Sequence, residues 1–139
     1  MHANLPSWLK QKCTEDNKLS LRYNNGSQIK AVASGDESGR SEALSLLVID
    51  EAAHVDGLDE LWKGLYPTLS TGGRCIALST PNGIGDWFYR MYSDADAGLN
   101  DFHPTTLSWD VHPDRDEEWY KKETRNMTKK EIAQELECS

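Results

Sequence analysis

The most distinctive pattern along the chain is a pair of short apolar runs separated by a segment with helical periodicity. Leu46–Ile49 is an unbroken apolar run, which indicates a strand buried on both faces, as in parallel sheets covered by helices. Over residues 58–69 apolar positions recur every three or four residues, as along one helix face, and Pro67 is expected to kink or end that helix. Residues 75–78 form a second apolar run, and another helix is expected from Asp86. This order predicts a parallel βαβ unit.

Weaker patterns lie on the N-terminal side of this unit. Residues 5–10 are expected to form a short helical start. Residues 19–23 and 28–33 alternate apolar and polar side chains on either side of an Asn-Asn-Gly-Ser sequence, whose residues accept the positive φ of tight turns. These segments predict a β-hairpin.

The last third of the chain is more charged. Residues 102–109 are expected to hold one more strand, and residues 114–123 are expected to be helical. Thr128 and Glu131 have the spacing of a capping box, in which each side chain binds a free amide at the start of a helix. A final helix is therefore expected over residues 129–136.

Composition and charge narrow the class of protein. The 139 residues fit one domain, and 37% hydrophobic with 27% charged residues is typical of a soluble globular chain. The formal net charge of -8 has the wrong sign for a chain that wraps nucleic acid over its whole surface, although a local basic patch stays possible. There is no apolar run of about 18 residues, so no membrane association is expected.

Two carboxylates follow the first apolar run. Asp50 and Glu51 stand at the end of the predicted strand, which is the arrangement of a Walker B motif. Because neighbouring strand residues point to opposite sides, one carboxylate could serve a nucleotide-bound Mg²⁺ while the other polarises the attacking water. The alternative is that the pair only begins a loop or caps a helix.

A second polar motif follows the other apolar run. Ser79 and Thr80 begin a Ser-Thr-Pro-Asn-Gly sequence, and their hydroxyls could reach the Walker B acids, or the sequence could be an ordinary turn. Arg40 could reach a phosphate, although a solvated loop arginine is the simpler interpretation. His54 is interpreted as a residue at the start of a helix rather than a ligand or base. The phosphate-binding sequence GxxxxGK[ST] does not occur in the chain.

Together these motifs resemble the large terminase subunit of tailed bacteriophages, and they occur in that family's order over nearly the whole chain. The resemblance is carried by residues 26–31, Arg40, residues 46–53, residues 79–83, Trp109, His112, Pro113, Trp119 and residues 133–138. It implies a motor that uses ATP to move double-stranded DNA into a preformed capsid.

The resemblance also implies roles for individual residues. Asp50 would be the magnesium residue, Glu51 the catalytic glutamate, and Ser79 with Thr80 the coupling motif. Arg40 would bind the nucleotide, although Ser41 follows it where the family usually has glycine. The implied cofactors are ATP and Mg²⁺. The implied partners are double-stranded DNA, the portal protein, the small terminase subunit and further copies in a ring, at the procapsid portal vertex in the cytoplasm of an infected bacterium.

The expected fold is therefore a partial α/β domain of the P-loop NTPase type (RecA/ASCE-like), with a mostly parallel sheet flanked by helices. Residues 1–100 would form the second half of the ATPase core. Residues 101–139 would form a small helical lid that leads towards a nuclease domain. The family's phosphate-binding loop is expected upstream, so the isolated chain is expected to be almost inactive as an ATPase.

Two other functions remain open on the sequence alone. A DEAD/DEAH-like helicase ATPase has a similar acidic motif, although residues 50–54 are one residue longer than a DEAH box. The chain could also be a non-catalytic interaction module that keeps only the fold.

Overall fold

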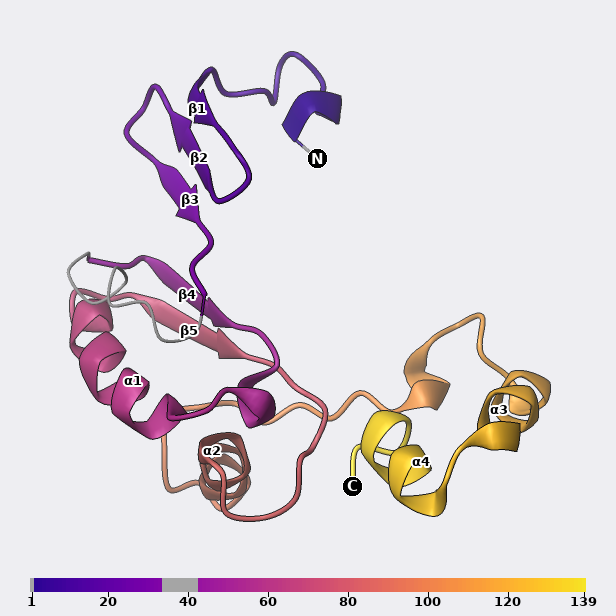
Figure 1. The fold of residues 1–139 in the computed structure, drawn as a ribbon. Helices are drawn as coiled ribbons and strands as arrows, with labels where there is room; N and C mark the ends of the chain where they lie inside the picture. The colour runs from indigo at the N-terminus through magenta and orange to yellow at the C-terminus, as the bar shows by residue number, and fades with distance from the viewer. Residues whose placement is uncertain (1, 34–42) are drawn as a thin grey trace. The chain divides into compact units, whose positions relative to one another are not determined.

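The computed structural model describes residues 2–33 and 43–139, which form parts of two compact units (Figure 1). The first unit spans Met1–Ser41 and the second spans Glu42–Ser139. Each unit is described by itself below. Within the described ranges, no helix is long and apolar enough to cross a membrane.

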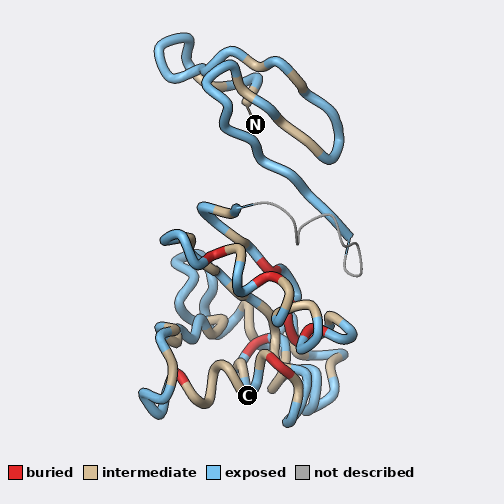
Figure 2. The backbone as a smooth tube through the Cα atoms, turned by 90° about the vertical axis from the view of Figure 1, so that its left-hand side faces the viewer, coloured by how far each residue is buried: buried red, intermediate tan, exposed pale blue. Residues whose placement is uncertain are grey.

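The first unit contains a three-stranded antiparallel sheet. The predicted hairpin is confirmed: β2 (Ser20–Tyr23) pairs with β3 (Gln28–Lys30), with Leu21 opposite Ile29. Gly26 has a φ of 87° in the turn, a conformation that glycine adopts without the steric cost of a Cβ atom. None of residues 2–33 is buried (Figure 2).

One expectation for the first unit was wrong, and one of its strands was not predicted. Residues 5–10 form turns rather than a helix, since the only helical residues nearby are the 3-10 turn His2–Asn4. The strand β1 (Cys13–Asp16), which pairs with β2, was not expected. Its Cys-Thr-Glu-Asp sequence has no alternation of apolar and polar residues and two residue types that are depleted in strands, so pairing with β2 rather than local preference defines it.

The second unit is built on a parallel βαβ unit, as the apolar runs predict. Strand β4 (Leu46–Ile49) leads to helix α1 (Leu58–Leu65), and the chain returns to strand β5 (Arg74–Ala77). The two strands are parallel and in register from the Leu46–Arg74 pair to the Ile49–Ala77 pair. Helix α2 (Trp87–Asp96) follows. Residues 43–139 are thus mixed α/β with one parallel strand pair.

Local chemistry explains where these helices begin and end. Helix α1 ends at Leu65 and continues as the 3-10 turn Tyr66–Leu69, because Pro67 cannot donate the next helical hydrogen bond. The Asp86 carboxylate accepts a hydrogen bond of 2.8 Å from the Tyr89 amide and caps α2. Arg90 of α2 forms an ion pair with Asp59 of α1.

The buried core lies on one face of the two-stranded sheet. It consists of Ile49, Ala52, Leu58 and Trp87, around which α1, α2 and Phe102 pack. The Trp62 ring contacts the rings of Trp87 and Phe102, and its centroid lies 5.0 Å from that of Trp87. In Figure 2 the buried stretches of the chain gather in this second unit.

The expectation that the strands are buried on both faces was wrong for this structure. The other face of the sheet is exposed, with Leu46, Val48 and Ile76 each more than half accessible to solvent. The alternating burial along β4 and β5 shows that only Leu47, Ile49, Cys75 and Ala77 face the core. An unbroken apolar run therefore indicates a strand whose two faces are both apolar. In this structure the described residues cover only one of these faces.

The C-terminal part contains a 3-10 turn at Trp109–Val111 and two short helices, α3 (Glu117–Glu123) and α4 (Lys129–Glu135). The capping box is confirmed, because Thr128 and Glu131 exchange both hydrogen bonds. The Thr128 amide also holds the pKa of the Glu131 carboxyl below its ordinary value.

Residues 102–109 do not contain the strand expected there. Residues 102–107 have no assigned secondary structure, and Trp109 already belongs to the 3-10 turn. A strand needs a neighbour for its backbone groups, and within the described chain β5 pairs only with β4.

Truncating the most deeply placed core residue of α1 should destabilise the second unit strongly. Leu58 is 2% exposed, so Leu58→Ala should lower the free energy of unfolding by about 2–5 kcal/mol through lost burial and the cavity left behind. Urea unfolding followed by tryptophan fluorescence measures this change. Ile84→Ala, at a residue that is 85% exposed, is the matched control and should change stability by less than about 0.5 kcal/mol. Equal losses in the two variants would contradict the core described here.

Candidate functional site

The loops that follow β4 and β5 are joined by backbone hydrogen bonds. The Leu78 amide donates to the Ile49 carbonyl at 3.0 Å, and the Leu78 carbonyl accepts from the Ala52 amide at 3.0 Å. The parallel pairing thus continues past the strand ends and brings the two polar motifs side by side. Ligands in open α/β sheets bind at this edge, beyond the carboxyl ends of the strands.

Ser79 lies between the two motifs. Its hydroxyl oxygen accepts a hydrogen bond of 3.1 Å from the Ala53 amide, and the hydroxyl points to the Glu51 carboxylate with 3.5 Å between Oγ and Oε2. The first contact has ordinary hydrogen-bond geometry, whereas the second is at the limit and is weak in this state. The structure therefore brings Glu51 and Ser79 together.

The backbone turns sharply at Glu51. Its φ of 51° and ψ of 43° place it in the left-handed region, which costs a residue with a side chain about 1–2 kcal/mol. The Asp50 carboxylate accepts a hydrogen bond of 3.1 Å from the Glu51 amide. The two carboxylates are therefore placed by this turn after β4, and not by the alternation of side chains along a strand, as the sequence interpretation assumed.

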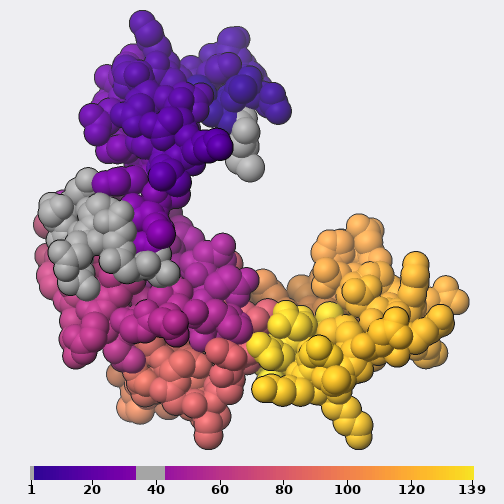
Figure 3. All heavy atoms as spheres, viewed as in Figure 1, coloured from indigo at the N-terminus to yellow at the C-terminus, as the bar shows by residue number. Residues whose placement is uncertain are grey.

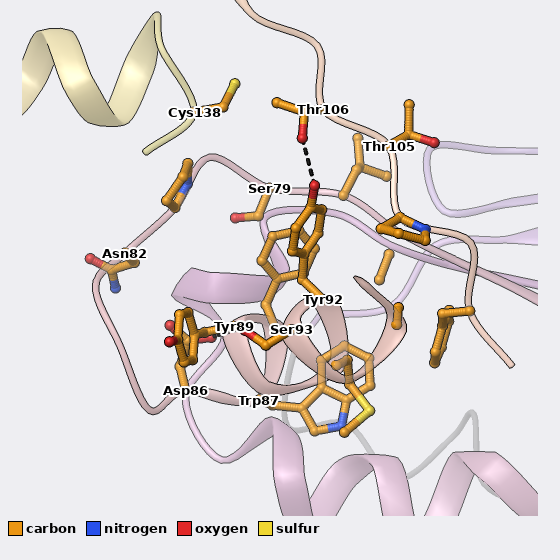
Figure 4. A pocket seen from close by; sticks show the side chains of 18 of the residues that line it. Ser79, Asn82, Asp86, Trp87, Tyr89, Tyr92, Ser93, Thr105, Thr106 and Cys138 are labelled. Carbon is orange, nitrogen blue, oxygen red and sulfur yellow. Dashed lines mark hydrogen bonds between the residues drawn. The ribbon is translucent and has the colours of Figure 1, made fainter. Parts of the chain in front are cut away.

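Two further side chains connect the loops. Nε2 of His54 lies 3.4 Å from the Thr80 hydroxyl, and the Asn82 side-chain amide donates to the Ala53 carbonyl at 3.2 Å (Figure 4 shows Ser79 and Asn82 on their loop). Thr80 thus contacts His54 rather than an acid. The sequence interpretation gave neither His54 nor Asn82 a role, since both contacts join residues that are 26 or 29 positions apart.

The carboxylates and hydroxyls at this edge of the sheet differ in their exposure to solvent. Asp50 and Glu51 are exposed, whereas Ser79 and Thr80 are partly buried. Among the described residues, no group of three or more His, Cys, Asp or Glu side chains could hold a metal ion. Protein-bound Mg²⁺ commonly takes only one or two carboxylates and completes its shell with water and phosphate oxygens. Arg40, the predicted nucleotide-binding residue, lies outside the described residues.

A relative in phage Mu matches most of the chain. The chain is 33% identical over 103 residues to the probable terminase large subunit gp28 of Escherichia phage Mu, a match that covers 72% of this chain and 18% of that protein. No family model matches. The chain is related to phage terminase large subunits. The match therefore confirms the family to which the motifs pointed.

Solved structures agree with this assignment at the level of the fold. The large terminase ATPase domain of Thermus phage P74-26 and a mutant of it each match with a TM-score of 0.65 and 23% identity. Each match covers 93% of this chain and 63% of that domain. The chain thus has the fold of part of a terminase ATPase domain, and it spans less than two thirds of the length of each protein it matches.

The strained backbone at Glu51 gives a test of the site that does not depend on activity. In both Glu51→Gly and Glu51→Ala the carboxylate is lost, but only glycine adopts a positive φ without a steric cost. Glycine loses more backbone entropy on folding than alanine does, and this loss offsets part of the relieved strain. Glu51→Gly should therefore be more stable than Glu51→Ala by about 0.5–1 kcal/mol. Urea unfolding of the two variants side by side measures the difference. An alanine variant that is as stable as the glycine variant would mean that the left-handed turn is not formed in solution.

Proposed function

We propose that this chain is part of the ATP-hydrolysing motor of a phage terminase that moves double-stranded DNA into a procapsid. The observation that carries the proposal is the contact between the loops after β4 and β5, in which Ser79 lies between the Ala53 amide and the Glu51 carboxylate. The relationship to a terminase large subunit supports it. The complete domain would have a fold of the P-loop NTPase type, with a mostly parallel sheet.

The two carboxylates have different surroundings and are proposed for different roles. Asp50 would hold Mg²⁺, which supplies charge neutralisation at the phosphates of bound ATP. Glu51 would act as the general base that orients and polarises the attacking water. The turn at Glu51 suits this role, because it carries the second carboxylate out of line with the strand and towards Ser79.

Ser79 and Thr80 are proposed to couple hydrolysis to movement. Each hydroxyl contacts the loop after β4, Ser79 through the Ala53 amide and Glu51, Thr80 through His54. A change at Glu51 during hydrolysis would therefore reach the loop after β5 through short contacts, and the Asn82 bond to Ala53 would carry the displacement further along that loop.

Several parts of the proposal rest on the family alone. Arg40 would contact the nucleotide, residues 1–100 would belong to the ATPase core, and residues 101–139 would form a lid. The partners would be the portal protein, the small terminase subunit and further copies in a ring at the portal vertex in the infected host cell. Because the chain contains no GxxxxGK[ST] sequence, it should hydrolyse ATP poorly by itself.

The proposed base can be tested in a longer protein that carries this segment together with a phosphate-binding loop. Glu51→Gln keeps the size and hydrogen bonding of the side chain but removes the base, so hydrolysis should fall by about 10²-fold or more while ATP binding persists. Phosphate release and nucleotide titration measure the two quantities. Glu60→Gln, on the exposed face of α1, is the matched control and should hydrolyse ATP normally. Normal hydrolysis by Glu51→Gln would remove Glu51 from this role and would favour a non-catalytic module.

The coupling role is tested by removing both hydroxyls in the same longer protein. Ser79→Ala with Thr80→Ala deletes the contacts to the β4 loop, and nucleotide affinity should change by less than about tenfold, or about 1.4 kcal/mol. DNA packaging should fail, because hydrolysis no longer moves the second loop. Ser70→Ala is the control for loss of an exposed hydroxyl. A double variant that packages DNA normally but melts at a lower temperature would show that the motif is only a turn.

A further inference from the structure

The C-terminal part of the chain carries a local cluster of basic side chains. Five of the ten residues 121–130 are basic and one is acidic, so this segment has a net charge of +4 in a chain of net charge -8, and the remaining residues together carry -12. In Figure 3 the orange and yellow atoms of the C-terminal part, which include this segment, are in open view on the face shown. The five basic side chains, all exposed to solvent and called the basic corner below, are Lys121, Lys122, Arg125, Lys129 and Lys130.

The side chains of the basic corner have no partners inside the described part of the chain. Elsewhere in the second unit Lys63 forms an ion pair with Glu60, and Arg90 forms one with Asp59. Within residues 2–33 and 43–139, no ion pair or side-chain hydrogen bond involves any of the five corner residues. Their charges are therefore available to a ligand.

Folding does not account for where these charges stand. Lys121 and Lys122 lie in the last turn of α3, where cations interact favourably with the negative end of the helix dipole. Lys129 and Lys130 instead begin α4, where the helix dipole is positive and cations are unfavourable. The second pair of lysines thus lowers the stability of its helix, and the contacts of the fold give no reason for it.

Hydrogen bonds hold the two helices of the corner in place. The Tyr120 hydroxyl of α3 donates to the Glu137 carboxylate, which follows α4, at 2.9 Å. The Thr124 hydroxyl donates to the Tyr120 carbonyl at 2.8 Å at the end of α3. The Glu131 carboxylate accepts from the Thr128 amide at 2.6 Å, so it caps α4 rather than pairing with a lysine. The corner therefore presents its cations from a fixed backbone.

Five cations on one short segment suit a ligand with many closely spaced negative charges. Duplex DNA carries one negative charge per about 1.7 Å of its axis, and lysine and arginine side chains bind its phosphates. Because the rest of the chain is strongly acidic, a duplex is repelled from most of its surface and approaches where the local charge is positive. An extended polyanion engages the whole corner, whereas a single free phosphate engages a small part of it.

We propose that the basic corner binds the phosphate backbone of double-stranded DNA. The inference rests on the proposed function for the identity of the polyanion. The contact is independent of base sequence, since phosphate contacts carry no sequence information directly. It requires no ATP hydrolysis, so it can be measured without nucleotide.

The test is a titration of the 139-residue chain with a fluorescent duplex of mixed sequence and about 30 base pairs, followed by anisotropy from about 50 to about 200 mM salt. The logarithm of the association constant should fall linearly with the logarithm of the salt concentration, by about 0.9 for each phosphate contact. Lys129→Gln with Lys130→Gln removes two contacts, so the slope should decrease by about 1.8. Binding at about 50 mM salt should weaken by at least about tenfold.

A matched variant separates the corner from net charge. Lys63→Gln with Arg74→Gln changes the net charge by the same amount at two exposed positions outside the corner, and it should keep the slope of the unaltered chain. Thermal melts separate binding from folding. Lys129→Gln with Lys130→Gln should melt no lower than the unaltered chain, because it removes two cations from the start of α4.

Three results would overturn the proposal. One is folded chain that does not bind the duplex at about 50 mM salt. Another is an equal change of slope in the two double variants. The third is self-association without DNA that the corner variant abolishes while the slope stays unchanged, which would make the acidic surface of a second copy the partner.

The outcome is independent of the test of Glu51. A chain that does not stay folded by itself is replaced by a longer terminase protein that carries this segment, in which the same difference of slopes is required. Because no nucleotide is present, a failed titration leaves the roles proposed for Glu51 and Ser79 untouched. Normal hydrolysis by Glu51→Gln would likewise leave the measured slopes as they are.

Discussion

The parallel pairing of β4 with β5 is the constraint on which the rest of the second unit depends. It fixes the register from Leu46–Arg74 to Ile49–Ala77, and this register decides which residues meet beyond the strand ends. Because the pairing extends through the Ala52–Leu78 bond, Ser79 arrives beside Ala53 and Glu51. A slip of one residue would turn Ser79 to the other face of the sheet and would separate the two motifs.

The turn at Glu51 lowers the folding stability that the core provides. Glu51 adopts a left-handed backbone at a cost of about 1–2 kcal/mol, and such strain persists only where the surrounding structure holds it. The residues next to it supply that support, since Ala52 and Ala53 are buried and Ala52 packs in the cluster with Leu58 and Trp87. The exposed Glu51 carboxylate is therefore carried on a strained backbone that a well-packed neighbouring segment holds in place.

Local patterns predicted much of this unit, and contacts between distant segments account for what was missed. The apolar runs predicted β4 and β5, and of the polar residues that follow them the structure brings Glu51 and Ser79 together. The turn at Glu51 and the contacts of His54 and Asn82 could not be predicted, because they depend on how two loops meet. Residues 102–107 show the opposite case, since a local preference for a strand is not realised without a neighbour.

Gly73 shows how the pairing of β4 with β5 limits which residues the chain can carry at a position away from Glu51 and Ser79. A Cβ atom at this position would lie 2.1 Å from the Leu44 carbonyl oxygen and 2.9 Å from a Leu69 methyl group, closer than atoms can approach. Every other amino acid would push the entry of β5 away from the chain that leads into β4. A saturation mutagenesis screen scored on folding alone should therefore find that no other residue is tolerated at this position.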